Sequence, residues 1–174
     1  DIESVSISAD GEYIVVGSID DKVYLFDKDS STPLWSYDTD GDVSEVDISA
    51  DGEYVVAGSD DDKVYLFNKD SSTPLWTYDT GGDVGTIAIS ADGEYITAGG
   101  GEYGDVTYLF NKDSSTPLWD YEIAGAVYST AISADGEYIV RGAHHEVYLF
   151  DKDSSTPLWS YYTGAKFDSV AISA

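Results

Sequence analysis

A unit of about 41 residues is repeated four times along this chain of 174 residues. Its first signature is Ala-Asp-Gly-Glu-Tyr, which begins at Ala9, Ala50, Ala91 and Ala134. Its second is Lys-Asp-Ser-Ser-Thr-Pro-Leu-Trp, which begins at Lys28, Lys69, Lys112 and Lys152. A fixed period of this length marks an architecture of stacked supersecondary units. We expect one domain over 1–174, divided into repeats at about 1–41, 42–82, 83–125 and 126–165.

Each repeat holds four short apolar runs that are separated by turn residues. In the first repeat the predicted strands cover 4–8, 13–17, 22–26 and 34–38, and no 3.6-residue periodicity supports a helix. Asp10-Gly11 is a strong hairpin signal, because glycine accepts a positive φ. Four antiparallel strands in about 41 residues are the size of one β-propeller blade. The sequence therefore predicts an all-β fold, a β-propeller of four four-stranded antiparallel blades.

The chain continues beyond the fourth repeat with another copy of the first predicted strand. Ser-Val-Ala-Ile-Ser at 169–173 repeats Ser-Val-Ser-Ile-Ser at 4–8. We expect 166–174 to form the extra inner strand of a fifth blade that lacks its other three strands. An unpaired inner strand exposes backbone groups that another chain can pair with. The pattern predicts a homo-oligomer, either an eight-bladed dimer or a filament, or else a place within a larger propeller.

The charge balance is strongly acidic and excludes several classes of function. Asp and Glu number 34 against 8 Lys and Arg, which gives a formal charge of −26 at pH 7. Nucleic-acid backbones and anionic membranes are bound by basic patches, so neither partner is expected. The chain has no cysteine, and no apolar run approaches the roughly 18 residues that cross a bilayer. We expect a microbial protein with an extracellular or cell-surface location and no membrane insertion.

Two propeller families resemble these repeats. Ser8–Tyr13, followed by Gly17-Ser18 and Asp21–Phe26, is similar to the start of a WD40 repeat. The second half of each repeat resembles the tryptophan-docking motif of quinoprotein-like (PQQ-type) propellers, in which Asp or Asn lies eight residues before a tryptophan and a glycine follows. The tryptophans at this position are Trp35, Trp76, Trp119 and Trp159.

The resemblance implies a structural role for these four tryptophans, each docking an outer strand against the neighbouring blade. It does not imply a quinone cofactor. Family members that are dehydrogenases hold quinone and calcium through inserted loops, often with a pair of cysteines, and this sequence has neither. We therefore expect no cofactor.

Alternating oxygen-bearing side chains mark the loop before each tryptophan. Asp27 and Asp29 in the first repeat, and Asp151 and Asp153 in the fourth, place carboxylates two residues apart, as a hard cation such as calcium prefers. Asx-type turns that close the hairpin explain the same residues. A calcium loop also needs glycine at its sixth position, where this chain has Thr32. We favour the turns and expect no metal, with calcium as the alternative.

The loops divide into a uniform set and a variable set. Among the four repeats, the turns after the first and third strands barely change, whereas the connections after the second and fourth strands differ freely. These two sets emerge on opposite faces of an up-and-down blade, and individual loops are where recognition resides. The candidate binding face comprises Tyr103, Arg141, His144 and His145.

The sequence predicts no catalytic constellation. His144 and His145 are its only histidines, and neighbours on a strand point to opposite faces, which makes them a poor metal chelate unless the loop bends. The many serines lack a placed histidine, and the paired aspartates recur as turn residues. We expect a non-catalytic structural or protein-interaction scaffold that self-assembles. The alternative is a ligand- or cation-binding domain that uses the variable face.

Overall fold

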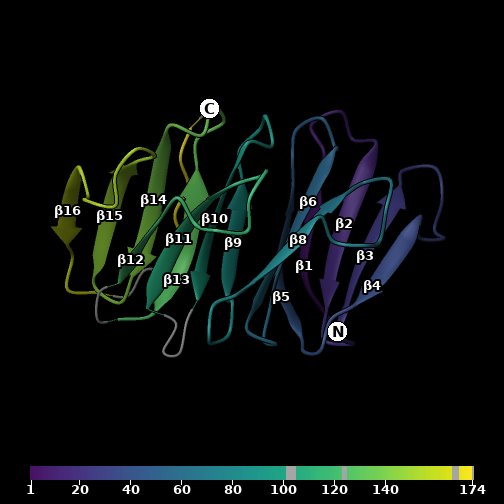
Figure 1. Cartoon of the computed structure of the whole chain (residues 1–174), viewed down its shortest axis with the longest axis horizontal. Helices are drawn as coiled ribbons and strands as arrows, with labels where there is room; N and C mark the ends of the chain where they lie inside the picture. Colours follow the sequence, from purple (N-terminus) through teal and green to yellow (C-terminus); the bar gives the residue numbers. More distant parts are fainter. Residues whose placement is uncertain (101–104, 123–124, 166–168, 174) are drawn as a thin grey trace.

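The computed structural model describes residues 1–100, 105–122, 125–165 and 169–173. These residues form sixteen strands in four antiparallel sheets, and they contain no helix with the length and apolarity to cross a membrane. The sheets stand side by side as the blades of an arc, with the fourth blade at the left of Figure 1 and the first at the right. The all-β class and the four-stranded blades predicted from the repeats are confirmed.

Each blade lies within one sequence repeat, and its strands pair in chain order. Blade one holds β1 (Ile2–Ile7), β2 (Tyr13–Ser18), β3 (Lys22–Asp27) and β4 (Trp35–Asp38). Blade two holds β5 (Val43–Ile48), β6 (Tyr54–Ser59), β7 (Lys63–Asn68) and β8 (Trp76–Asp79). Blade three holds β9 (Thr86–Ile89), β10 (Tyr95–Gly100), β11 (Val106–Asn111) and β12 (Trp119–Glu122). Blade four holds β13 (Val127–Ile132), β14 (Tyr138–Ala143), β15 (Glu146–Asp151) and β16 (Trp159–Tyr162).

A small hydrogen-bond network closes the turn between the first two strands of every blade. In blade one the Asp10 carboxylate accepts from the Ser8 hydroxyl (2.6 Å) and from the Glu12 N–H (3.0 Å). The Ser8 oxygen accepts from the Tyr13 N–H (3.0 Å), while Gly11 adopts a φ of 74°. The same bonds recur at Ser49 and Asp51, Ser90 and Asp92, and Ser133 and Asp135. Local turn chemistry therefore sets the same strand pairing in each repeat.

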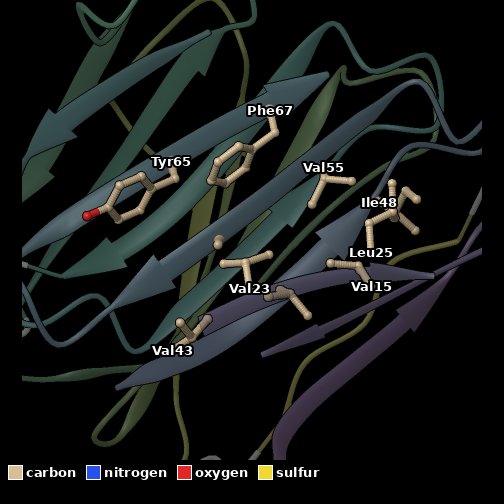
Figure 2. Close-up of a cluster of buried hydrophobic side chains, with 10 residues drawn as sticks. Val15, Val23, Leu25, Val43, Ile48, Val55, Tyr65 and Phe67 are labelled. Carbon is tan, nitrogen blue, oxygen red and sulfur yellow. The ribbon is translucent and has the colours of Figure 1, made fainter. Parts of the chain in front are cut away.

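The apolar core lies between successive blades. Val15, Val23 and Leu25 of blade one are fully buried. They pack against a blade-two set that includes Val43, Ile48, Val55, Tyr65 and Phe67 (Figure 2). Equivalent clusters join blades two and three, and blades three and four. Apolar area removed from water between the sheets is thus the main force that holds the arc together.

Glycine permits a close approach between neighbouring blades at the first turn. Gly52 of blade two has a φ of 73°, and a β-carbon placed there would lie 2.6 Å from the ring of Tyr13 in blade one. The same relation joins Gly93 to Tyr54 and Gly136 to Tyr95. Each of these tyrosine rings rests on the turn glycine of the following blade, where any larger residue would displace it.

The terminal segment differs from the predicted extra strand. Residues 169–173 pair with no strand in the described part of the chain, and 166–168 and 174 lie outside it. The Val170 N–H donates to the hydroxyl oxygen of Ser129 in β13 (3.2 Å), and Val170 and Ile172 are half-buried. A strand requires a ladder of backbone hydrogen bonds with a neighbour, and here the described contact goes to a side chain. The predicted inner strand is therefore corrected to a non-strand segment that lies against blade four.

Candidate functional site

Three of the four motif tryptophans reach across to the following blade. In each case the indole N–H donates to the backbone oxygen of the lysine after the third strand of that blade. The pairs are Trp35 with Lys69 (2.7 Å), Trp76 with Lys112 (2.8 Å) and Trp119 with Lys152 (2.8 Å). The same rings pack on Phe67, Phe110 and Phe150, with centroid distances of 5.3, 5.4 and 5.4 Å. These tryptophans therefore fasten the outer strand of one blade to the next.

Trp159 carries the same motif in a different environment. It lies in β16, the outer strand of blade four, and its exposed fraction is 49%. All four residues of β16 are exposed, whereas β4, β8 and β12 alternate between half-buried and exposed residues. The identical motif gave no sign of this difference, because the burial of this side chain depends on the following blade.

The variable connections meet at one end of the blades. The N–H of Thr39, after β4, donates to the backbone oxygen of Asp21 in the loop after β2 (2.7 Å). The equivalent bonds join Thr80 to Asp62 (2.8 Å) and Thr163 to His145 (2.8 Å). Asp21 adopts a φ of 64°, a left-handed conformation that Asp tolerates better than most residues. The loops expected to carry recognition therefore lie side by side, joined by backbone hydrogen bonds.

His144 and His145 occupy a bend between β14 and β15. Their ring centroids lie 3.9 Å apart at an interplanar angle of 72°, so the loop turns both rings toward each other. Strand geometry would have pointed the two rings to opposite faces, and the bend brings them into contact instead. Both rings line a hollow of about 180 Å³. Its other lining residues are Gly125, Ala143, Glu146, Tyr148 and Tyr162.

Two features give this hollow a polar character. The Tyr148 hydroxyl donates to the Glu146 carboxylate (2.5 Å). Burial, together with this hydrogen bond, raises the pKa of Tyr148 above its ordinary value. The Nδ1 atom of His145 is buried and has no hydrogen-bond partner among the described residues. Buried polar atoms are normally paired, so the burial of this nitrogen without a partner carries an energetic cost.

Arg141, expected on the exposed variable face, is instead fully buried within β14. Its Nη2 donates to the backbone oxygens of Asp105 and Gly125, each at 3.0 Å. Its guanidinium lies 5.8 Å from the ring centroid of Tyr121 and 5.5 Å from that of Tyr148, and burial lowers the pKa of Arg141. The correction follows from strand alternation, which points this side chain toward blade three at a position that is Val or Ala in the other blades.

The buried Arg141 holds two of the variable connections, because one carbonyl acceptor lies between β10 and β11 and the other between β12 and β13. Tyr103, the remaining residue of the expected face, lies outside the described residues. Among the four candidates, the structure thus brings His144 and His145 together at the surface and removes Arg141 from direct contact with a partner.

The candidate calcium residues act as turn caps. The Asp27 carboxylate accepts from the Asp29 N–H (2.8 Å), and Asp151 does the same for Asp153 (2.9 Å). Asn68 and Asn111, which carry no charge, make the equivalent bond in blades two and three at 3.0 Å. The shared acceptor oxygen explains the pattern as an Asx turn. Within the described ranges, no three His, Asp or Glu residues are grouped as metal ligands.

Two half-buried carboxylates on β5 were not assigned a role from the sequence. Glu45 accepts from the Ile87 N–H of the next blade (2.6 Å), and Asp47 accepts from the Ile89 N–H (3.0 Å) and the Ser6 hydroxyl (2.8 Å). Burial raises the pKa of both side chains. The sequence feature that marks them is a pair of acidic residues at inner-strand positions where the other repeats have small, uncharged side chains. They join the inner strands of three consecutive blades.

Comparison with known proteins agrees with this architecture. A search of curated proteins finds no match. Among solved structures, the chain is similar to a WD40 β-propeller chain in "Crystal Structure of Mitotic Checkpoint Complex", with a TM-score of 0.82 and 15% identity over 97% of this chain. The match covers 56% of that chain, so this protein spans just over half of its neighbour's length.

A family model gives the more specific result. The model described as "Outer membrane protein assembly factor BamB", which represents PQQ-type repeats, matches residues 3–106. The PQQ-like and WD40-like resemblance predicted from the repeats is therefore confirmed. Since the match covers more than half of the sequence and the blades carry the tryptophan contacts described above, the chain belongs to the PQQ-type repeat family described as outer membrane protein assembly factor BamB.

Proposed function

We propose that this chain is a self-assembling, non-catalytic scaffold of an extracellular or cell-surface microbial protein, and that it recognises partners through the variable loop face. The observation that carries this proposal is the contrast between the two ends of the blades. At one end the same Ser-Asp turn bonds recur in every blade. At the other end, equivalent loops differ in length, charge and aromatic content.

The arrangement suits recognition because the variable loops are mounted on a fixed frame. The inter-blade tryptophan bonds and the buried Arg141 hold the strands and connections from which the loops emerge. Loops positioned in this way bind partners with little loss of conformational entropy. The acidic surface adds solubility and favours partners that present basic groups.

A random-peptide display library tests the location of the recognition face. We expect peptides selected on the intact chain to lose affinity for the double variant His144→Ser, His145→Ser. The matched control is Ser31→Ala, Ser72→Ala, which alters the uniform end and should leave binding unchanged. Peptides that depend on the uniform end and ignore the histidines would contradict the proposal. Circular dichroism of both variants verifies that the fold is retained, since exposed loop changes usually cost within about 0.5 kcal/mol each.

A second candidate function is binding of a small ligand or cation in the hollow beside His144 and His145. The two imidazole rings and the Glu146 side chain that line this hollow favour it. Imidazole nitrogen and carboxylate oxygen are ligands that Zn²⁺ accepts. Calorimetric titration with Zn²⁺ and with Ca²⁺ distinguishes the two candidates. Stoichiometric heat that is lost in His144→Ser, His145→Ser would favour the ligand-binding function, and the absence of heat would leave the scaffold as the better explanation.

A further inference from the structure

The two ends of the arc each leave an apolar face uncovered. On blade one, Val5 has an exposed fraction of 63%, although its equivalent Val46 in blade two has 3%. Val5 lines an open hollow of about 470 Å³ together with Ile2, Val16, Tyr24 and Phe26. In blade two the corresponding residues are buried by blade one. We call this surface, formed by Ile2, Val5, Val16, Tyr24 and Phe26, the leading face.

Blade four carries the opposite surface. Its exposed aromatic residues include Tyr138, Trp159 and Tyr161, the last with an exposed fraction of 65%. Their equivalents in blade one are Tyr13, Trp35 and Tyr37, which pack against blade two. We call the surface of Tyr138, Trp159 and Tyr161 the trailing face. A trailing face already meets a leading face at each of the three contacts between successive blades.

The polar and steric details of the internal contact are also present at the free ends. Trp35, Trp76 and Trp119 each donate to the lysine oxygen of the following blade, and the lysine at that position in blade one is Lys28. Tyr13, Tyr54 and Tyr95 each rest on a turn glycine, and at Gly11 a β-carbon would meet nothing within 4 Å. At Gly11 the position that a tyrosine ring occupies beside the other three turn glycines is therefore open.

We propose that the trailing face of one copy of this chain packs against the leading face of a second copy, with the Trp159 indole donating to the Lys28 backbone oxygen of that copy. This rests on the self-assembly proposed above and names its interface. The contact is head-to-tail, and a second identical contact closes two arcs into a ring of eight blades. The match of the arc to 56% of a longer propeller chain, with a TM-score of 0.82, shows that four blades have the curvature of part of a larger ring.

The segment 169–173 stands in the way of this contact and must move. It lies against β13 in the register of an inner strand, because Val170 bonds to Ser129 as Val46 bonds to Ser4. The β1 strand of the incoming copy needs that place. Displacing the segment costs less than stripping β1 from β2, because β1 is held by a five-residue antiparallel pairing whereas Val170 and Ile172 are only half-buried. The intact blade one therefore displaces the segment.

Net charge opposes the contact and determines the conditions for its test. Two chains that each carry −26 repel one another, and salt screens this repulsion. Sedimentation velocity of the full chain in about 0.5 M NaCl, where the Debye length is about 4 Å, should show a concentration-dependent monomer and dimer. A monomer at every concentration would overturn both the contact and self-assembly. A continuous series of larger species would overturn the closed ring.

Single substitutions test the two faces separately. Trp159→Ala and Val5→Arg should each weaken dimerisation by at least about tenfold, as expected for the centre of an interface. Val5→Arg lowers the net negative charge, so a loss cannot come from added repulsion. Leu158→Ala is the matched control, because Leu158 is 54% exposed and its equivalent Leu75 stays 53% exposed beside a neighbouring blade. Dimerisation that ignores both face variants would leave self-assembly in place and overturn this contact.

Mixing the two variants tests the head-to-tail arrangement. The Val5→Arg chain retains its trailing face, and the Trp159→Ala chain retains its leading face, so the mixture can form one intact contact that neither variant forms alone. We expect a heterodimer in the mixture, detected with a fluorescent label on one variant. No gain on mixing would overturn the head-to-tail contact. Val170→Ser, Ile172→Ser should strengthen dimerisation by loosening the competing segment, and an unchanged or weaker dimer would overturn its displacement.

Discussion

The backbone N–H of Val170 donates to the hydroxyl oxygen of Ser129 at 3.2 Å. The equivalent bond between blades three and four runs from the Thr130 N–H to Thr86 Oγ1 at 3.0 Å. The same relation joins Ile87 to Glu45 and Val46 to Ser4. In each case a side chain of one inner strand satisfies a backbone donor of the next, which is a connection that repeats from blade to blade. The terminal segment therefore uses the contact of an inner strand without belonging to a sheet.

The first prediction compares two tryptophans with the same motif. Trp76→Ala should lower the free energy of unfolding by about 3–5 kcal/mol, because the ring packs on Phe110 and its indole bonds to Lys112. Trp159→Ala should change it by no more than about 0.5 kcal/mol in the monomer, since the ring is half exposed. Urea unfolding at low protein concentration measures both. Equal losses would contradict the different environments of the two rings.

The second prediction compares two glycines with the same backbone conformation. Gly11→Ala and Gly52→Ala both place a side chain at a φ near 74° and 73°, which costs about 1–2 kcal/mol. Gly52→Ala should cost about 1–3 kcal/mol more, because its β-carbon would overlap the ring of Tyr13. Chemical denaturation of the two variants gives the difference. If both variants lose the same free energy of unfolding, the contact between the Tyr13 ring and Gly52 contributes nothing to stability.

The third prediction concerns the half-buried Glu45. Burial raises the pKa of the Glu45 carboxyl in the folded state above its ordinary value of 4.5. At pH values just above 4.5 this carboxyl therefore keeps its proton in the folded protein but loses it in the unfolded chain. The stability contribution of this group is therefore lost with rising pH. Glu45→Gln should be more stable than the parent at pH 7, and the advantage should vanish below pH 4.5.

The control for Glu45→Gln is Glu3→Gln, which removes the same charge from an exposed position on β1. Urea unfolding of the three proteins across this pH range isolates the effect of burial. A pH dependence shared by both variants would assign the effect to net charge instead.

The fourth prediction concerns salt. With −26 on one chain, the charges repel one another more in the compact state, so the melting temperature should rise between low and moderate ionic strength. Asp42→Asn, Asp83→Asn removes two exposed charges and should reduce this response. Differential scanning calorimetry in increasing NaCl provides the measurement. A flat or falling melting temperature would mean that bound cations or local pairs already compensate the acids.

The sequence alone determined the blade architecture. Its four copies of a Ser-Ala-Asp-Gly turn and a tryptophan motif predicted the all-β class and the four-stranded antiparallel blades. This succeeded because turns such as Ser8 to Tyr13 are closed by hydrogen bonds between residues at most five positions apart. Hydrogen bonds between residues so close in the chain can be predicted from the local sequence.

Only the tertiary structure decided which copies of a repeated residue are buried. Trp35 and Trp159 share one motif but differ in environment, Arg141 turned inward from an expected surface, and 169–173 lacks the ladder that its strand-like sequence predicted. His144 and His145 came together because their loop bends. In each case the outcome depends on what lies beside the residue in space, and burial is a property of the neighbouring blade that a repeated local sequence does not contain.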